Sequence, residues 1–568
     1  MAKGIWLISR ETLPLSIKDK LLEICTAISP DNITPNPPKI EVNNFRAYAV
    51  VNPYSSMLTT KSGLLLGKIF NQNEKWDIPC EAYPDGSFAL FRDGDKFSEV
   101  VSDPAASRTI WYYIDQHMFV ASTSQRAIVL LVGTFEFDKR VIPWILSTGS
   151  LGPLYSWDKR IKRIPSDSSI ILDKEKWEIT VKSNLIEFKE SKVSAQIHET
   201  TFISTINSIF KKIKFNYSNW VVPLSGGFDS RAILCLFKKN QELDNIKTIT
   251  WGLKAALKDS NNDVVIAKRL ANALNVSHEF LSTDISNEPI EIIFHRFFQN
   301  GEGRVDHISG YMDGFNIWKS LFENRIEGII RGDINFCSST VSTPQELRFS
   351  LGLAFCSDFS NLKDYADYQG FEQELPANFL RKNNESLLQW RDRLYLEYRI
   401  STILAALSDL KLSYVELVNP LLSKEILELV RTLPDHLRNE KRIFKKMVNS
   451  ISPNIPYASE GGGAKAADIL RENRIQSLLL QEISTKHAYE LLPSDLLDTI
   501  QENLKASKNG ESGKLKTPYK SLLRKIIPKS FRKRIKTKIQ SSQSVDYNIL
   551  AFRVYMIIKM YKLLSKIN

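Results

Sequence analysis

Short apolar runs alternate with turn signals over the first 190 residues of the chain. Runs such as Ala47–Val51, Ser87–Phe91 and Phe119–Ser122 are rich in β-branched and aromatic residues, which favour strands. Turn sequences such as Pro84-Asp85-Gly86 lie between the runs and separate one strand from the next. This pattern predicts a β-rich first domain that covers residues 1–190.

The pattern changes near residue 196, where helical segments begin to alternate with short strands. Apolar side chains recur at helical spacing in Thr200–Lys212 and in Asp263–Leu274. The apolar runs that predict strands in this part are Trp220–Leu224, Lys247–Trp251 and His278–Leu281. Strands that alternate with helices are typical of a parallel sheet with crossover helices. Because the chain after residue 350 has mostly helical patterns, we predict an α/β domain over residues 196–500 with a helical C-terminal part.

The composition is typical of a globular protein without a membrane span. Hydrophobic residues make up 43% of the 568 residues and charged residues 25%. No apolar run reaches the length of about 18 residues that a spanning helix needs. The first residues lack a long apolar segment with a small-residue cleavage site, which argues against secretion. The five cysteines are scattered and lack Cys-x-x-Cys spacing, which predicts reduced thiols in a cytoplasmic protein.

The net charge of +12 comes from one end of the chain. Residues 505–568 contain 17 lysines and arginines and 2 acidic residues, which gives this segment +15 and leaves −3 for the rest. A nearly neutral body argues against a nucleic-acid partner. We predict a basic C-terminal tail with helices over residues 505–568. Within it, Lys525–Lys538 could contact an acidic partner, a membrane surface or a leader peptide, or lie free in solvent.

One loop carries the clearest chemical signal in the sequence. The predicted strand that ends at Leu224 runs into Ser225-Gly226-Gly227-Phe228-Asp229-Ser230 and then into a helix. Glycines let the backbone approach an anion closely, and a helix N-terminus presents unpaired N–H groups to it. Asp229 would repel phosphate unless it holds Mg²⁺, which often binds one or two carboxylates together with phosphate oxygens. The loop lacks the Gly-Lys-Ser/Thr ending of a Walker A motif, so it predicts a different kind of phosphate site.

This loop resembles the pyrophosphate loop, SGGxDS, of the ATP-pyrophosphatase superfamily, and its surroundings resemble the asparagine synthetase branch. That branch has a strand ending in an aromatic residue and a glycine, then an acidic residue and a helix with spaced alanines. The matching residues here are Trp251-Gly252, Asp263, Ala267 and Ala271, followed by His278 on the next strand. Segments that resemble the family's C-terminal part are Asn419-Pro420-Leu421-Leu422, Leu433-Pro434 and Arg442-Ile443-Phe444-Lys445. Segments that resemble the core of its glutaminase domain are Asp85-Gly86-Ser87-Phe88, Asp103-Pro104, Tyr112-Tyr113 and Ala121-Ser122, so the resemblance spans residues 40–470.

The resemblance implies which residues bind ATP and Mg²⁺. The residues expected to contact ATP are Leu224, Ser225, Gly226, Gly227, Asp229, Ser230, Trp251 and Gly252. Mg²⁺ would lie between Asp229 and Asp333. Asp333 belongs to Arg331-Gly332-Asp333, which stands where the family has a longer loop of the form GEGADE. It could replace either the metal-binding aspartate or the glutamate of that loop.

The resemblance also implies a lysine that stabilises the departing pyrophosphate. Our candidate is Lys465, which follows three successive glycines, Gly461-Gly462-Gly463, that would let a loop close over a ligand. Lys445 and Lys446 are the alternatives. A further pair, Asp306 and His307, could line the acyl-substrate pocket or could serve as an ordinary helix cap and a satisfied histidine.

The first domain departs from the family's glutaminase. That enzyme uses a cysteine exposed at the mature N-terminus, whose own amine is the base, whereas position 2 here is Ala2. The first cysteine is Cys25, which lies inside an apolar, helix-like stretch. We therefore predict a glutaminase-like (Ntn-type) β-rich sandwich without glutaminase activity, followed by an ATP-pyrophosphatase α/β domain.

The leading hypothesis is an ATP-dependent carbon–nitrogen ligase of the kind used in asparagine biosynthesis. ATP would adenylate a small-molecule or peptide carboxylate and release pyrophosphate, and ammonia or a substrate amine, rather than glutamine, would then displace AMP. A peptide macrolactam cyclase or a β-lactam synthetase, which uses an internal amine, is one alternative. A non-catalytic nucleotide-binding member of the family is another, and nucleic-acid modification fits the neutral body less well. The carboxylate, the amine and the oligomeric state stay open.

Overall fold

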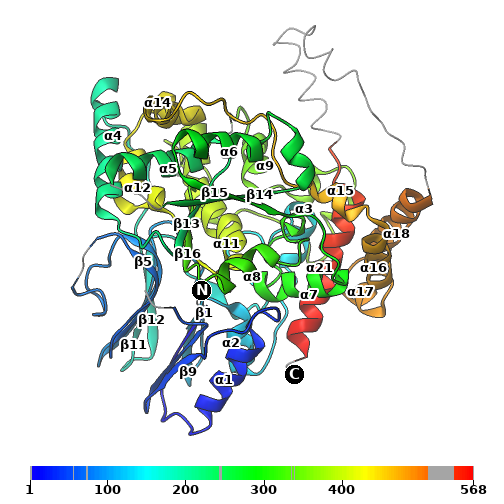
Figure 1. The fold of residues 1–568 in the computed structure, drawn as a ribbon. Coiled ribbons are helices and arrows are strands. Elements are labelled where there is room, and N and C mark those ends of the chain that lie inside the picture. The colour runs from blue at the N-terminus through cyan, green and yellow to red at the C-terminus, as the bar shows by residue number, and fades with distance from the viewer. Residues whose placement is uncertain are drawn as a thin grey trace.

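The computed structural model describes residues 3–54, 57–71, 74–241, 246–333, 336–337, 340–509 and 543–566. Two antiparallel sheets come first, a parallel sheet follows, and helices make up most of the C-terminal part (Figure 1). The expected α/β fold class is therefore confirmed. The segment Lys525–Lys538 lies outside the described residues. Among the helices that are described, none combines the length and the apolar character that crossing a membrane requires.

The two antiparallel sheets each contain six strands and pack face to face. The first sheet has the order β10-β8-β9-β1-β3-β2 and the second β12-β11-β7-β6-β5-β4. The strands of the first sheet are β1 (Lys3–Ser9), β2 (Lys39–Val42), β3 (Arg46–Val51), β8 (Trp111–Ile114), β9 (Met118–Ser122) and β10 (Lys162–Arg163). Those of the second are β4 (Leu58–Thr59), β5 (Gly63–Ile69), β6 (Gly86–Asp93), β7 (Phe97–Ser102), β11 (Ser168–Asp173) and β12 (Glu178–Ser183). The helices that cover the outer face of the first sheet are α1 (Ile17–Ala27) and α2 (Gln125–Val132).

Strand β1 is buried on both of its faces. Trp6 and Ile8 face the second sheet, where the rings of Trp6 and Phe91 stack with centroids 5.8 Å apart. Ile5 and Leu7 face the opposite way, into the core that includes α1 and α2. A strand covered on both faces needs apolar residues at successive positions, so this strand does not show the alternating pattern of a half-exposed one.

The parallel sheet has the strand order β15-β14-β13-β16-β17 and carries helices on both faces. Its strands are β13 (Trp220–Pro223), β14 (Lys247–Gly252), β15 (Ser277–Ser282), β16 (Gly328–Ile330) and β17 (Glu416–Val418). One face is covered by α4 (Ala195–Lys212), α5 (Phe228–Asn240), α6 (Asp263–Ala273), α12 (Lys424–Arg431) and α14 (Arg442–Ile451). The other is covered by α7 (Ile290–Gly301), α8 (Asn316–Glu323) and α11 (Ala405–Leu412). Parallel strands need crossover connections, and here these connections place helices on both faces of the sheet. The parallel pairing also places the carboxyl ends of β13, β14 and β16 at one edge.

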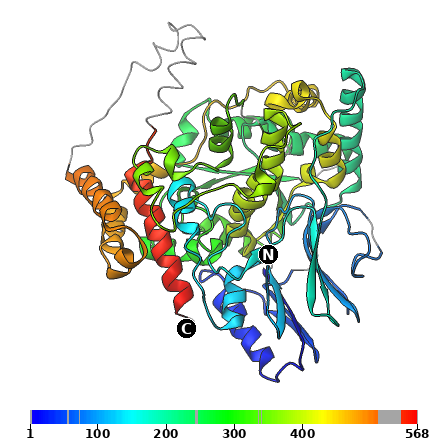
Figure 2. The ribbon, with the colours of Figure 1, turned by 180° about the vertical axis from the view of Figure 1, so that it is seen from behind.

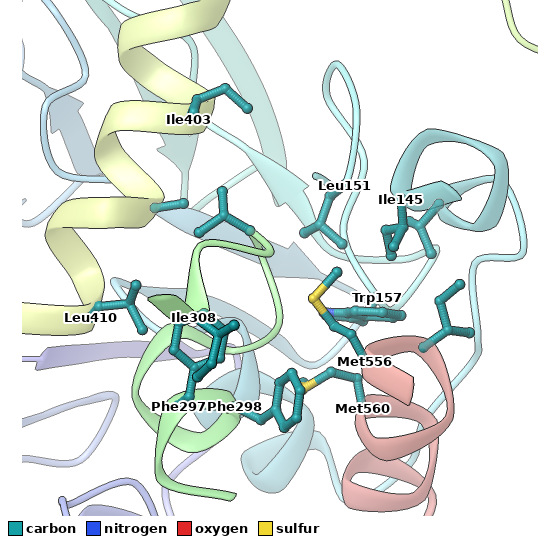
Figure 3. Close-up of a cluster of buried hydrophobic side chains, with 14 of the residues drawn as sticks. Ile145, Leu151, Trp157, Phe297, Phe298, Ile308, Ile403, Leu410, Met556 and Met560 are labelled. Atoms are coloured by element: carbon teal, nitrogen blue, oxygen red, sulfur yellow. The ribbon is translucent and has the colours of Figure 1, made fainter. Parts of the chain in front are cut away.

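The C-terminal part wraps around one end of the molecule. Its helices are α15 (Ala466–Leu470), α16 (Asn473–Ile483), α17 (Lys486–Leu491), α18 (Ser494–Asn509) and α21 (Tyr547–Ser565). Helix α3 (Val141–Thr148), from much earlier in the chain, packs against α21. Helix α21, red in Figure 2, lies alongside these helices, and it is buried over most of its length. Met556 and Met560 of α21 point toward Trp157 and Phe298 (Figure 3). The last helix of the chain therefore belongs to the main core.

Helix α21 also explains the pair Asp306 and His307. The Arg553 guanidinium donates to Asp306 Oδ2 at 2.8 Å, and His307 lies 3.3 Å from the same carboxylate. Burial opposes ionisation of Asp306, but Arg553 and His307 outweigh it and hold its pKa at about 2. These contacts fasten α21 to the protein through ion pairs, a role different from the helix cap that the sequence analysis considered.

Residues 401–424 form one of the regions through which the sandwich contacts the parallel-sheet domain. Arg108 and Glu416 form a buried ion pair. The Asn419 backbone N–H donates to Ser87 Oγ at 3.1 Å, which ties the end of β17 to β6. Because breaking a buried ion pair leaves an unpaired charge in the interior, such contacts fix the position of the segment. The sandwich thus supports the part of the parallel sheet that is farthest along the sequence.

Candidate active site

The predicted phosphate loop joins β13 to α5 at the carboxyl edge of the parallel sheet. The Ser225 backbone N–H donates to Ser230 Oγ at 3.0 Å, and the two serine hydroxyls lie 3.0 Å apart. The Gly227 N–H donates to Ser225 Oγ at 3.3 Å. These contacts hold the loop in a compact turn, while Leu224 is anchored by an N–H that donates to Ile249 O at 2.8 Å.

The N-terminus of α5 is open toward this loop. Gly227 is the residue before the helix, and no side chain caps the first turn. A Cβ added at Gly227 would meet only Ser225 Oγ, at 3.5 Å, so space remains beside the backbone. Uncapped N–H groups at the start of a 13-residue helix attract an anion through their partial positive charge. The geometry leaves room for an anion at the loop, and phosphate binding there stays a prediction.

Residues 458–463, which we call the strap, lie across the loop and the end of β14. The Ala458 N–H donates to Gly226 O at 3.1 Å, and the Leu253 N–H donates to Gly462 O at 2.8 Å. A Cβ at Gly226 would stand 2.4 Å from Ala458 Cβ, and one at Gly252 would stand 2.8 Å from Gly462 O. Glycine is therefore required at both positions because the strap passes too close for any side chain.

Asp229 forms an ion pair with a lysine from α14's N-terminus. Lys441 Nζ donates to both carboxylate oxygens of Asp229, at 2.9 and 2.7 Å. Burial raises the pKa of Asp229, Lys441 opposes the shift, and the negative charge of Asp333 adds to it. About a third of the Asp229 side chain remains accessible (35%), so the carboxylate can still meet a ligand.

Asp333 lies on the neighbouring loop, directly after β16. Arg331 Nη2 donates to Asp333 Oδ1 at 2.9 Å. A Cβ at Gly332 would stand 2.7 Å from Asp229 O, so the two loops touch through their backbones. The structure therefore brings the two predicted carboxylates, Asp229 and Asp333, into one site, each with a basic partner.

The two carboxylates fit a Mg²⁺ ion that also binds phosphate. Among the described residues, no group of three or more His, Cys, Asp or Glu side chains is placed to hold a metal by itself. Mg²⁺ typically takes one or two carboxylates and completes its shell with phosphate oxygens and water. Asp229 and Asp333 would supply the carboxylates after exchanging Lys441 and Arg331 for the ion.

The three candidate lysines lie at different places around the loop. Lys465 is exposed and directly precedes α15, beyond the strap. Lys446 pairs with Glu199 on the surface, and Lys445 lies over the Phe228 ring at 5.3 Å. Lys441, which the sequence analysis did not select, is the lysine that contacts Asp229.

A tyrosine near the two carboxylates was also missed. Tyr395 begins a π-helical stretch, Tyr395–Leu404, that continues α10 (Leu387–Leu394). Burial raises the pKa of Tyr395, and the nearby charges of Asp333 and Asp229 add to the shift. π-Helical turns often occur at functional sites, but their backbone geometry leaves no recognisable signal in a single sequence.

Comparison with known proteins gives one family match. Residues 220–295 match the family described as asparagine synthase, and this range contains β13, the loop, α5, β14, α6 and β15. No curated protein matches the chain. A solved structure, glutamine phosphoribosylpyrophosphate amidotransferase from B. subtilis complexed with ADP and GMP, aligns at 8% identity and a TM-score of 0.19. The alignment covers 49% of this chain and 65% of that one, just under two thirds of its length, and these values are too low to establish a shared fold. The family match is therefore limited to residues 220–295, over which this chain is similar to asparagine synthase.

Proposed function

We propose that the protein forms amide bonds at the expense of ATP through an acyl-adenylate, with ammonia or a substrate amine as the acceptor. The observation that carries the proposal is the convergence of an open helix N-terminus with Asp229 and Asp333. The helix N-terminus and Asp229 lie within residues 220–295, which match asparagine synthase, and Asp333 joins them from a later loop. The substrates would be a small-molecule or peptide carboxylate and an amine. We place ATP against Leu224–Ser230 and against Trp251 and Gly252 at the end of β14.

The residues at the site would act by position and charge. The N–H groups of α5 and the hydroxyls of Ser225 and Ser230 would bind the phosphates. Bound Mg²⁺ would neutralise phosphate charge as the α-phosphorus is attacked. Lys441 would turn from Asp229 to the pyrophosphate and stabilise its growing charge, the role that we first gave to Lys465. The strap would keep water from the reacting groups.

The products test the reaction type. If the carboxylate is adenylated, ATP must be cleaved at the α-phosphorus, and AMP and pyrophosphate must form in equal amounts. A carboxylate library can be screened with hydroxylamine as a general acceptor amine, followed by chromatography of the nucleotides. Stoichiometric ADP and phosphate would instead point to an acyl-phosphate route and refute the adenylation step.

Glutamine should not serve as the amine source. Cys25 is 2% exposed in α1, and burial raises the pKa of its thiol to about 12, so it is neither accessible nor a thiolate at neutral pH. We expect no glutamate release from glutamine, and we expect Cys25→Ala to leave ATP-dependent activity within a factor of about three. Glutamate release by the purified wild type that disappears in Cys25→Ala would return the chain to the glutamine-dependent class.

A second candidate function is nucleotide binding without catalysis. The observation that favours it is that both metal-site carboxylates are already paired, Asp229 with Lys441 and Asp333 with Arg331. A purely regulatory site could hold ATP with these pairs intact and would need no Mg²⁺. Calorimetric titration of ATP with and without Mg²⁺ separates the two functions, because only the catalytic one requires the metal for tight binding.

A further inference from the structure

A cavity of about 500 Å³ lies between the outer helices of the sandwich and α7. Residues that line it include Thr26, Ser29, Asn36, Asn52, Arg126 and Gln299. They come from α1, the loop after it, the end of β3, α2 and α7 (Figure 1), and none belongs to the candidate active site. Its volume lies within the range of about 300–1,000 Å³ that is usual for small-molecule sites.

Arg126 is the unusual residue of this cavity. Its side chain lines the cavity, and the residue is only 7% exposed. Within the part of the chain that the structure describes, the Arg126 side chain makes no hydrogen bond or ion pair, and its Nη1 is enclosed without a partner. Burial lowers the pKa of the Arg126 guanidinium, and Glu302 opposes the shift. Arginine nevertheless keeps its charge in proteins, and a buried charge without a hydrogen-bonded partner is costly.

The acidic residues near Arg126 are already engaged. Glu302 lies 3.6 Å from Lys3 Nζ and accepts hydrogen bonds from Ser124 and from the Gln125 N–H. Asp31 lines the cavity, but it accepts two hydrogen bonds from Arg296, at 2.6 and 3.0 Å.

Arg126 is therefore the one unpaired charge among the described residues that line the cavity. Gln299, on the facing helix α7, makes no side-chain hydrogen bond in the described part of the chain and adds an amide donor.

We propose that this cavity binds a small organic carboxylate, held by Arg126 and Gln299. Because Nη1 is enclosed, the Nε and Nη2 edge of the planar guanidinium would donate the two parallel hydrogen bonds to the oxygens of a carboxylate. A carboxylate fits better than a phosphate because a single cation lines the cavity and Asp31, although it is paired with Arg296, adds a negative charge that disfavours a multiply charged anion. The remaining walls are amides, hydroxyls, prolines, small apolar residues and the Cys25 thiol. This site goes beyond the amide-forming reaction and does not depend on it.

The test is the thermal unfolding of the full chain in sodium acetate, succinate or L-glutamate, with sodium chloride at matched ionic strength as the reference. In the wild type at least one of these carboxylates should raise Tm in a saturable way. Arg126→Met should lose that rise, yet it should unfold in chloride at the same or a higher temperature, because it removes an unpaired buried charge. Asp229→Asn should keep the rise, so failure of the proposed reaction would not affect this result.

A second variant keeps the test decisive if Arg126→Met does not fold. Gln299→Leu should need about tenfold more of the same carboxylate for half of the Tm rise. An unchanged half-saturation in Gln299→Leu would contradict the proposal. So would equal rises in the wild type and Arg126→Met, or the absence of any rise in the wild type with all three carboxylates. A lower Tm of Arg126→Met in chloride would show that Arg126 already has a resident partner and would also overturn it.

Discussion

Asp229→Asn should lower ATP-dependent turnover by about a thousandfold, or about 4 kcal/mol of transition-state stabilisation. Asparagine has the same shape and keeps one oxygen acceptor, but it lacks the charge that would bind Mg²⁺ and that now pairs with Lys441. Phosphate charge at the loop would then remain uncompensated during attack on the α-phosphorus. Initial rates of pyrophosphate release, measured with saturating ATP and Mg²⁺, give the comparison.

Asp468→Asn is the matched control for this substitution. Asp468 is an exposed aspartate of α15, with 66% of its side chain accessible, and its surface contact with Arg471 contributes little. We expect wild-type turnover in Asp468→Asn, and we expect Asp468→Asn and Asp229→Asn to have similar Tm values. Full turnover in Asp229→Asn would remove Asp229 from the mechanism, whatever the state of the metal.

Lys441→Met should separate metal binding from catalysis. In the ligand-free protein Lys441 occupies both oxygens of Asp229, with only 13% of its side chain exposed, so it competes with a metal ion there. Its removal should tighten the binding of Mg²⁺ measured without nucleotide. The same change should reduce turnover by about a hundredfold, because a positioned charge that stabilises a transition state contributes about 3 kcal/mol.

Lys446→Met provides the control for charge removal near α14. Lys446 pairs with Glu199 on the surface, so its loss should change neither Mg²⁺ affinity nor turnover appreciably. Two results would contradict the role of Lys441: wild-type turnover in Lys441→Met, or Mg²⁺ affinity that falls together with turnover. If Lys465→Met alone abolished turnover, the pyrophosphate role would return to Lys465.

The pair Lys441 and Asp229 also shows how far the sequence could lead toward the site. Asp229 could be selected from the sequence because the features that suggest its role are close to it in the chain. The glycines, the serines and the following helix all lie within a few residues. Lys441 is 212 positions away, and its side chain reaches the loop only because α14 packs against α5. Both Lys441 and the preceding Glu440 have positive φ values, 58° and 56°, a local conformation that no single-sequence pattern indicates for these residue types.

The sequence by itself determined the fold class and singled out one loop as the candidate phosphate site. Strand and helix periodicities predicted a β-rich first part and the parallel sheet because they reflect which faces of each element are buried, whereas the sandwich came from the family resemblance. Tertiary structure alone decided the partners that close the site: Lys441 on Asp229, and the strap on Gly226. It also decided the place of α21, which basic composition had assigned to a tail over residues 505–568, although its apolar residues fill the main core. Composition averages over a segment, whereas burial depends on which distant surfaces meet, and those surfaces are defined only in the folded chain.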